Sequence, residues 1–424
     1  MFLLLGSLAV LLFLGVPIAY SLGISSFFYF FMNEPDLIAV LPQRLFAGFS
    51  SYSLMALPLF IFMGMLMNES GITQRLINFC MLFVGRLRGG LGLVNVGSSM
   101  VFGGISGSST SDTASIGSIL IPAMEKKGYP KKFSSGITVA SSTMGMIIPP
   151  SIPMVLYAIA AQESVGALFL AATIPGLMIG LFQVGMTIFI AYKNKFPKED
   201  IKISLSIVVT EVIKSSYVLV MPILIIGVVI LGIATPTESS AIAVVYAAVI
   251  GFFLTRNLTM KQFLSCVSAT VTTSSKIMMI IALSQLYIWV LALEDIPYQI
   301  STFLTGLELS PIALMLLLGL FILAIGTFLD VSPAILILTP IFLPVAAEAG
   351  VSSLQFGVLL ITGLAVGACT PPVGNCLNVC SAISKMGIGQ IFMGALPFLS
   401  ANVFIMVITI FFPATVLWLP SLLS

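Results

Sequence analysis

The chain of 424 residues is 59% hydrophobic and only 8% charged, and its 17 Lys and Arg residues nearly balance 15 Asp and Glu residues. A water-soluble fold of this composition would lack the polar side chains that cover a protein surface, so we expect an all-α membrane protein, a polytopic helical bundle in lipid. The chain has no His and no P-loop motif, which excludes His-based zinc sites, serine–histidine pairs and ATP binding by a P-loop.

Apolar stretches long enough to cross a bilayer start at the N-terminus. Residues 2–31, 221–234 and 392–419 approach or exceed the roughly 20 residues of a helical span. The first stretch lacks a basic leading region and a small-residue cleavage site, so we interpret it as a first membrane helix and not as a signal peptide. In total we expect about ten to twelve crossings together with shorter re-entrant pieces.

The segment 89–124 is nearly uncharged and has basic residues on both sides, with Arg86 and Arg88 before it and Lys126 and Lys127 after it. The positive-inside rule places both of its ends in the cytoplasm, which predicts a re-entrant helical hairpin. Two full crossings joined by short loops are the alternative. We favour the hairpin because a Gly- and Ser-rich middle, a poor helix former, lies where the turn is expected.

The expected tip of this hairpin is unusually polar, since residues 108–113 contain five hydroxyl groups and the carboxylate of Asp112. Such groups are costly at membrane depth unless they face a ligand or a water-filled cavity. Close helix packing is the alternative explanation for the small residues Gly103 and Gly104. An intramembrane carboxylate, in contrast, is a functional candidate.

The proline pair Pro149-Pro150 interrupts the apolar run that follows. Two prolines remove two amide donors and disfavour helical geometry at the preceding residue, which frees carbonyl groups from Gly145 to Ile148. These oxygens suit Na⁺, and the half-helix that begins near Ser151 offers a positive end to an anion. A simple proline kink in a structural helix is the alternative.

Between the two halves, the stretch 196–214 mixes lysines with aliphatic residues. This pattern predicts a helix that lies at the cytoplasmic interface, with an ordinary loop as the alternative.

The landmarks of the first half return at an offset of 222 residues, so that Pro371-Pro372 repeats the proline pair and Gly326 repeats Gly104. The flanks of the second segment lack Lys and Arg near its ends, which places those ends outside and makes the two copies inverted. In so apolar a chain, a duplication with paired Gly and Pro breaks is typical of a transporter whose binding site lies between two broken helices.

The second copy has its own tip and its own break. Asp330 lies at the expected tip, 218 residues after Asp112, so the two acids are analogous without being strictly equivalent. The second proline pair frees carbonyl groups from Gly367 to Thr370, and the half-helix that begins near Asn375 offers another positive end.

Over essentially the whole chain, these motifs resemble the large membrane subunit of a tripartite ATP-independent periplasmic (TRAP) transporter, most of all its sialic acid members. The resemblance implies Na⁺-driven uptake of an organic acid by an elevator movement in the bacterial inner membrane, with sialic acid (N-acetylneuraminate) favoured and a C4-dicarboxylate next. It implies a small membrane partner subunit and a periplasmic binding protein, and no nucleic acid. We expect scaffold helices at 1–88 and 193–310 and transport-domain units at 89–192 and 311–424.

Carried over residue by residue, the resemblance implies two Na⁺ sites, and the polar tip and the first proline break add Asp112 and Ile148 as candidate ligands. The expected ion ligands are Ser106, Ser108, Ser109, Asp112, Gly145, Ile148, Thr327, Asp330, Gly367 and Thr370. The expected substrate ligands, which lie near the tips and beyond the proline pairs, are Ser108, Ser109, Thr110, Pro150, Ser151, Gly374, Asn375 and Asn378.

Two other classes of function remain open on the sequence. A channel with polar re-entrant segments is the leading alternative, and a membrane-embedded enzyme is the third. An enzyme would need a nucleophile paired with a base, and the chain has no His to act as one.

Overall fold

The computed structural model describes residues 2–50, 52–198, 205–307 and 309–422. These residues form helices joined by turns, with no strand among them, as the fold class predicts. In the first half the helices are α1 (Phe2–Phe13), α2 (Ile18–Asn33), η1 (Pro35–Val40), α3 (Leu41–Phe49), η2 (Tyr52–Met55), α4 (Ala56–Glu69), α5 (Ile72–Val84), α6 (Gly90–Ser106), α7 (Ser109–Lys126), α8 (Lys131–Ser142), α9 (Met144–Ile147), α10 (Ile152–Ala161) and α11 (Val165–Lys193).

The second half repeats this order of elements. Its helices are α12 (Leu205–Ile230), α13 (Pro236–Val249), η3 (Ile250–Leu254), α14 (Met260–Leu293), α15 (Ile296–Thr305), α16 (Pro311–Gly326), α17 (Val331–Glu348), α18 (Ser353–Gly367), α19 (Asn375–Ser384), α20 (Ile388–Phe411) and α21 (Ala414–Ser421).

The duplication is confirmed at the level of whole elements. Shifted by 222 residues, the bounds of α7 coincide with those of α17, and the bounds of α10 fall one residue before those of α19. Both proline pairs have a cis peptide bond and lie between equivalent helices. The 222-residue offset between the Gly and Pro positions therefore also relates equivalent helices of the folded chain.

Long, continuous spans are fewer than the expected ten to twelve crossings. Among the described residues, five helices are long and apolar enough to cross a membrane, or up to seven if each of two bent pairs counts as one span. Five further apolar helices are shorter than a full span. The difference arises because Gly and Pro residues divide many apolar stretches into two helices.

The expectation of a single first membrane helix across residues 2–31 is wrong. The chain forms two helices there, α1 and α2, which pack against each other. The break has a local cause: Gly15 has a φ of +78°, which ends α1, and Pro17 precedes α2 with a φ of −55°.

The interfacial helix predicted over 196–214 lies partly outside the described residues, which omit 199–204. From Leu205 onward the chain belongs to α12, which continues to Ile230 as one helix of 26 residues.

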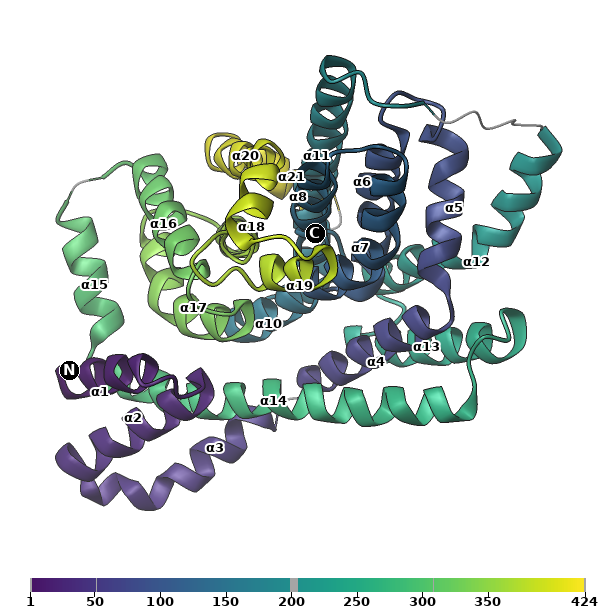
Figure 1. Cartoon of the computed structure of the whole chain (residues 1–424). Coiled ribbons are helices and arrows are strands. Elements are labelled where there is room, and N and C mark those ends of the chain that lie inside the picture. Colours follow the sequence, from purple (N-terminus) through teal and green to yellow (C-terminus); the bar gives the residue numbers. More distant parts are fainter. Residues whose placement is uncertain (1, 51, 199–204, 308, 423–424) are drawn as a thin grey trace.

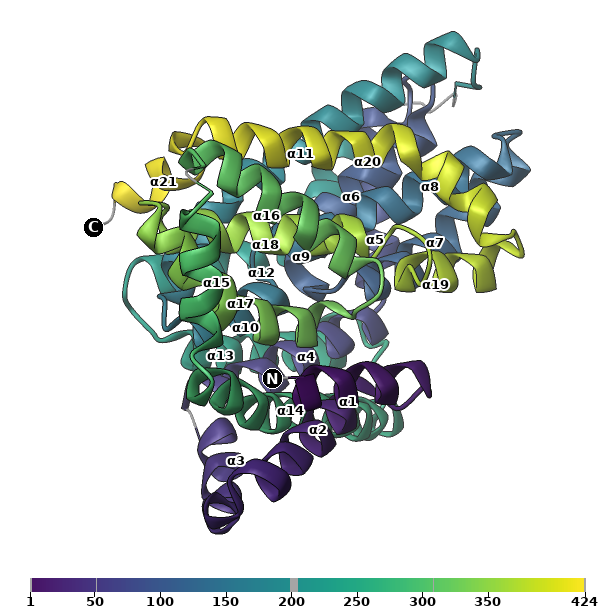
Figure 2. The same ribbon diagram turned by 90° about the vertical axis from the view of Figure 1, so that its left-hand side faces the viewer.

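Helices α4 and α14 form a wall along one side of the bundle. They pack against each other, and α14 also contacts α2, α3 and α17. Figures 1 and 2 show α14 running below the helices of both hairpins, α6–α7 and α16–α17. In Figure 2, α15 lies toward the left of the view while α7 and α8 lie toward the right, which agrees with hairpins that approach the centre from opposite ends.

Close backbone contacts hold each hairpin against its broken helix. A Cβ at Gly103 would lie 2.9 Å from the Cα of Gly145, and a Cβ at Gly367 would lie 2.5 Å from the carbonyl carbon of Gly326. Real Cβ atoms do not come this close to backbone, so both contacts need glycine. Equivalent contacts in the two repeats let each tip reach its proline break.

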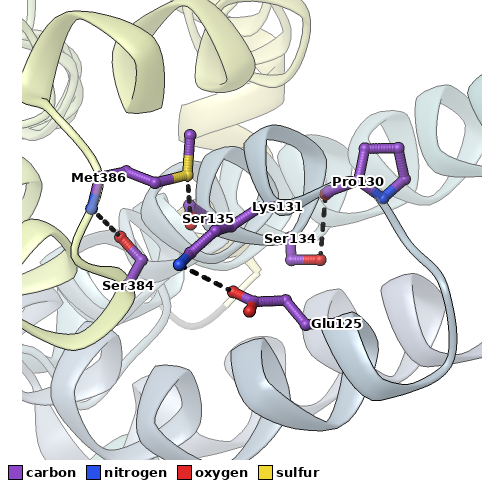
Figure 3. A network of polar contacts seen from close by, with 7 residues as sticks. All are labelled: Glu125, Pro130, Lys131, Ser134, Ser135, Ser384 and Met386. Atoms are coloured by element: carbon purple, nitrogen blue, oxygen red, sulfur yellow. Dashed lines mark hydrogen bonds and ion pairs between the residues drawn. The ribbon is translucent and has the colours of Figure 1, made fainter.

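Polar contacts join the base of the first hairpin to the second repeat (Figure 3). Lys131 Nζ lies 3.8 Å from Glu125 Oε1, and the hydroxyl of Ser135 on α8 donates to the sulfur of Met386, which follows α19, at 3.7 Å. Next to these contacts, α8 packs closely against α20. Because α8 also contacts α19, and α18 contacts both α9 and α10, the broken helices of the two repeats belong to one packed unit.

The α8–α20 contact generates a stability prediction. In Gly136→Ala, the new methyl group would lie 2.2 Å from the carbonyl carbon of Gly394, so the helices must separate at a cost of roughly 1–3 kcal/mol. We expect the apparent melting temperature in detergent to fall by several degrees.

Gly185→Ala in α11 is the matched control, because no atom lies within 4 Å of its added Cβ. Alanine is the better helix former by about 1 kcal/mol, so this variant should be as stable as the parent or more stable. Equal melting temperatures for both variants would contradict the close α8–α20 contact.

Candidate functional site

The first hairpin turns at Gly107, whose φ of +60° ends α6 and favours glycine. At the turn, Ser106 Oγ donates to Asp112 Oδ1 at 2.6 Å, and the hydroxyl oxygens of Ser108 and Thr110 lie 3.1 Å apart. The tip is inside the protein, since Ser109 is only 1% exposed. A buried tip supports the re-entrant hairpin over two full crossings.

Asp112 is fully buried directly behind this tip. Its Oδ1 accepts the bond from Ser106, whereas its Oδ2 has no hydrogen-bond partner among the described residues. A Cβ on Gly145 would lie 3.1 Å from that Oδ2, so the free oxygen faces the glycine backbone of the first break. A buried carboxylate oxygen without a partner is costly, and a cation offsets that cost.

The first break is tied to the tip by backbone contacts. α9 ends at Ile147, Ile148 is extended, and the amide of Ile152 at the start of α10 donates to the carbonyl of Gly107 at 3.4 Å. The buried Ser151 hydroxyl donates back to the carbonyl of Met146. The break therefore packs against the tip, and the Ser151 side chain bonds within the break.

The second tip differs from the first because its acid is exposed. Asp330 caps α17: its Oδ1 accepts from the amide of Val331 at 2.9 Å and from Asn375 Nδ2 at 3.3 Å. Thr327 is largely buried, its hydroxyl donates to Ala324, and its carbonyl accepts from the amide of Val373 at 3.2 Å.

The second break places its residues behind that tip. The hydroxyl of Thr370 donates to the carbonyl of Val366 at 2.8 Å, and Gly374, with a φ of +52°, precedes α19. Asn378 is exposed and donates to the carbonyl of Val373 at 3.0 Å.

One cavity of about 430 Å³, a size suited to a small organic ligand, brings the two tips together. Both hairpins, α19 and the wall of α4 and α14 contribute to its lining. Of the predicted site residues, the cavity is lined by Ser106, Ser108, Ser109, Thr110, Asp330 and Asn375.

The other predicted residues do not line the cavity, for two different reasons. Several predicted ion ligands lie behind the tips, where backbone contacts hold them: Asp112, Gly145, Ile148, Thr327, Gly367 and Thr370. Several predicted substrate ligands are turned away, and at the first break Ile152 and Pro153 line the cavity in their place: Pro150, Ser151, Gly374 and Asn378.

The donors available to a metal ion are oxygens of hydroxyl, carboxylate and carbonyl groups. Within the described residues, no three His, Cys, Asp or Glu side chains form a metal-holding group. Oxygen donors suit a hard cation, and free carbonyls at a broken helix suit Na⁺. The groups around Asp112 fit such an ion, because they include the partnerless Oδ2.

The predicted site residues do not include the wall of the cavity that faces the tips. It is formed by Met65 and Asn68 of α4 and by Thr273, Lys276 and Ile280 of α14. The sequence does contain a signal for Lys276, because it is the sole charged residue between Lys261 and Glu294 in a largely apolar stretch.

The two repeats touch at this site through Ser109 of α7 and Cys376 of α19, with 3.0 Å between Oγ and Sγ. We expect Ser109→Cys to form a disulfide with Cys376 under mild oxidation, since the two side chains already meet. The measurement is a mass-spectrometric search for the linked peptides, in a background where the other cysteines are replaced: Cys80, Cys266, Cys369 and Cys380.

Ser118→Cys provides the control, because Ser118 is exposed on α7 and bonds only within its own helix. This variant should not link to Cys376. Linkage of Ser118→Cys but not of Ser109→Cys would place the two repeats differently from the structure.

Known proteins resemble this chain along almost its whole length. The family model described as "Tripartite ATP-independent periplasmic transporter, DctM component" matches residues 5–415. The chain is 37% identical to the C4-dicarboxylate TRAP transporter large permease protein DctM of Pseudomonas aeruginosa, over 95% of this chain and 94% of that protein. It is 32% identical to the sialic acid TRAP transporter large permease protein SiaM of Vibrio cholerae, over 97% and 96%.

Among solved structures, the YdaH transporter of Alcanivorax borkumensis shares the fold, with a TM-score of 0.68. The alignment covers 89% of each chain at 13% sequence identity. At this identity the similarity concerns the fold alone.

Proposed function

The chain belongs to the DctM family, the large permease component of TRAP transporters, and on this premise we propose that it takes up an organic acid in symport with Na⁺. It is a multi-pass protein of the bacterial inner membrane, and a transporter rather than an enzyme. The observation that carries the proposal is the meeting of both hairpin tips and the second broken helix at one cavity.

The first proposed ion site lies around Asp112. Its Oδ2 faces Gly145 without a partner, and the hydroxyls of Ser106, Ser108 and Ser109 are nearby on the tip. The freed carbonyls before Pro149 complete a set of oxygen donors. A buried negative charge in low dielectric favours a cation at this position.

The second proposed ion site uses Thr327, Asp330, Gly367 and Thr370. Within the described residues, both hydrogen bonds of Asp330 use Oδ1, and the residue lines the cavity, so Oδ2 remains available to an ion. The exposed Asp330 and the buried Asp112 therefore offer two ion environments of different accessibility.

For the substrate, we propose binding in the cavity against the hydroxyls of Ser108, Ser109 and Thr110 and the start of α19 at Asn375. Hydroxyls and helix N-termini are common partners of anions. The related permeases are named for C4-dicarboxylates and for sialic acid, and both are organic acids. We keep both as candidate substrates.

The cavity also supports an elevator movement. Its lining combines the hairpins of the proposed transport units (89–192 and 311–424) with α4 and α14 of the proposed scaffold (1–88 and 193–310). A site at this boundary changes its surroundings when one part moves against the other. We further propose a small membrane subunit and a periplasmic binding protein as partners, as the tripartite family name indicates.

The proposal is tested by uptake into proteoliposomes that contain the large and small subunits, with the binding protein added outside. We expect uptake of sialic acid or of a C4-dicarboxylate only with an inward Na⁺ gradient and only with the binding protein. If the protein instead passes ions or solute much faster than a carrier can turn over, and does so without the binding protein, it is a channel.

Substitution of the two tip acids tests the ion sites. We expect Asp112→Asn and Asp330→Asn each to raise the Na⁺ concentration for half-maximal uptake by about tenfold or more, because the amide keeps the shape but loses the full charge. Asp112→Asn should still fold, since it removes a buried charge.

Asp36→Asn serves as the control for charge loss, because Asp36 is exposed on η1 and away from the cavity. Its Na⁺ dependence should equal that of the parent. If both tip variants are well folded and keep the parental Na⁺ dependence, the two acids are structural.

A further inference from the structure

Lys276 is a cation in the middle of a long apolar helix. It is the seventeenth of the 34 residues of α14, and no other charged residue occurs in that helix after Lys261. A lysine at membrane depth is costly, and such residues usually face a water-filled cavity or a partner of opposite charge.

The face of α14 that carries Lys276 is the face turned toward the tips. Thr273, Ile277 and Ile280, which lie three or four residues from one another, line the same cavity. Another face of α14 lines a separate hollow next to Pro58, formed by Thr270, Val271, Ser274, Ser275, Met278, Met279 and Ala282. The position of Lys276 on the cavity face is therefore specific.

No acid neutralises Lys276 within the described part of the chain. Lys276 and Asp330 are the two charged residues in the described lining of the cavity, yet no ion pair or hydrogen bond joins them. Asp330 instead bonds the amides of Val331 and Asn375. Lys276 thus presents a positive charge to the cavity from the wall opposite the hydroxyl-rich tip.

We propose that Lys276 is a specificity-determining residue that binds a second anionic group of the substrate. This inference rests on the proposed function. One acidic group is held at the tip by Ser108, Ser109 and Asn375, and the other reaches across the cavity to the ammonium group on α14. The substrate class that satisfies both walls at once is a dianionic organic acid.

The same geometry explains discrimination against acids with a single charge. A monoacid satisfies either the tip hydroxyls or Lys276 but not both, whereas a diacid pairs with both walls, so the monoacid loses one of the two charge-assisted contacts. Because Lys276 lies on α14 and the hydroxyls lie on the tips, one substrate can contact both only while the tips face α14.

Binding to the purified complex of large and small subunits tests this role without the selectivity of the periplasmic binding protein. The probes are C4 to C6 dicarboxylates, including succinate and glutarate, and their monoamides, titrated in Na⁺ with thermal stabilisation as the readout. In the parent protein, we expect at least one diacid to bind about tenfold or more tightly than its monoamide.

Lys276→Met should abolish this preference by weakening the diacid about tenfold or more while leaving the monoamide nearly unchanged. Lys276→Arg keeps the charge and should retain part of the preference. Lys261→Met is the matched control, because it removes the other lysine of α14, which is exposed and outside the cavity lining. It should bind both probes as the parent does.

Three outcomes would overturn the inference. Equal weakening of diacid and monoamide by Lys276→Met would make the lysine a structural residue. Unchanged binding of both would remove it from the site. Binding of N-acetylneuraminate, a monoacid, but of no dicarboxylate would exclude the dianionic class. Absence of any Na⁺-dependent organic acid binding by the parent would instead contradict the proposed function itself.

Discussion

The two proline pairs leave backbone groups without helical partners, and inside a bilayer such groups cannot turn to water. The structure meets this constraint by burying each break against the tip of a hairpin. Glycine at Gly103, Gly145, Gly326 and Gly367 permits the necessary approach of backbone to backbone. The hairpins, the close helix packing around them and the cavity between their tips all depend on this arrangement.

The two repeats use the same backbone plan but differ in the placement of their acids. Asp112 lies in the fourth position of α7, fully buried, whereas Asp330 caps the start of α17 and is exposed. The difference of four positions noted in the sequence thus separates a closed environment from one that opens into the cavity. Two copies of one backbone plan can in this way place one acid in a closed environment and the other where it is accessible from the cavity.

Much of this arrangement could be predicted from sequence because Gly and Pro determine the backbone conformation at their own positions. The offset between the proline pairs predicts the equivalence of α7 and α17, and the hydroxyls of residues 108–110 predict a polar tip. Which residues of a break line the cavity depends on how the hairpin tip packs against it, and the local sequence does not determine this. The sequence therefore predicts Ser151 as a substrate ligand, whereas in the structure its hydroxyl donates to the carbonyl of Met146. Lys276 was not predicted because it lies in an unbroken helix that is distant from both breaks in sequence, and only folding brings it to their cavity.

The backbone bonds between tip and break have a mechanical consequence. In the first repeat Ile152 donates to Gly107, and in the second Val373 donates to Thr327. A tip that moved alone would break these backbone hydrogen bonds and also the close glycine contacts between the tip and the broken helix. In the elevator movement that we propose, each hairpin would therefore move past α14 together with its broken helix, as one rigid unit, and the tip would not open as a separate flap.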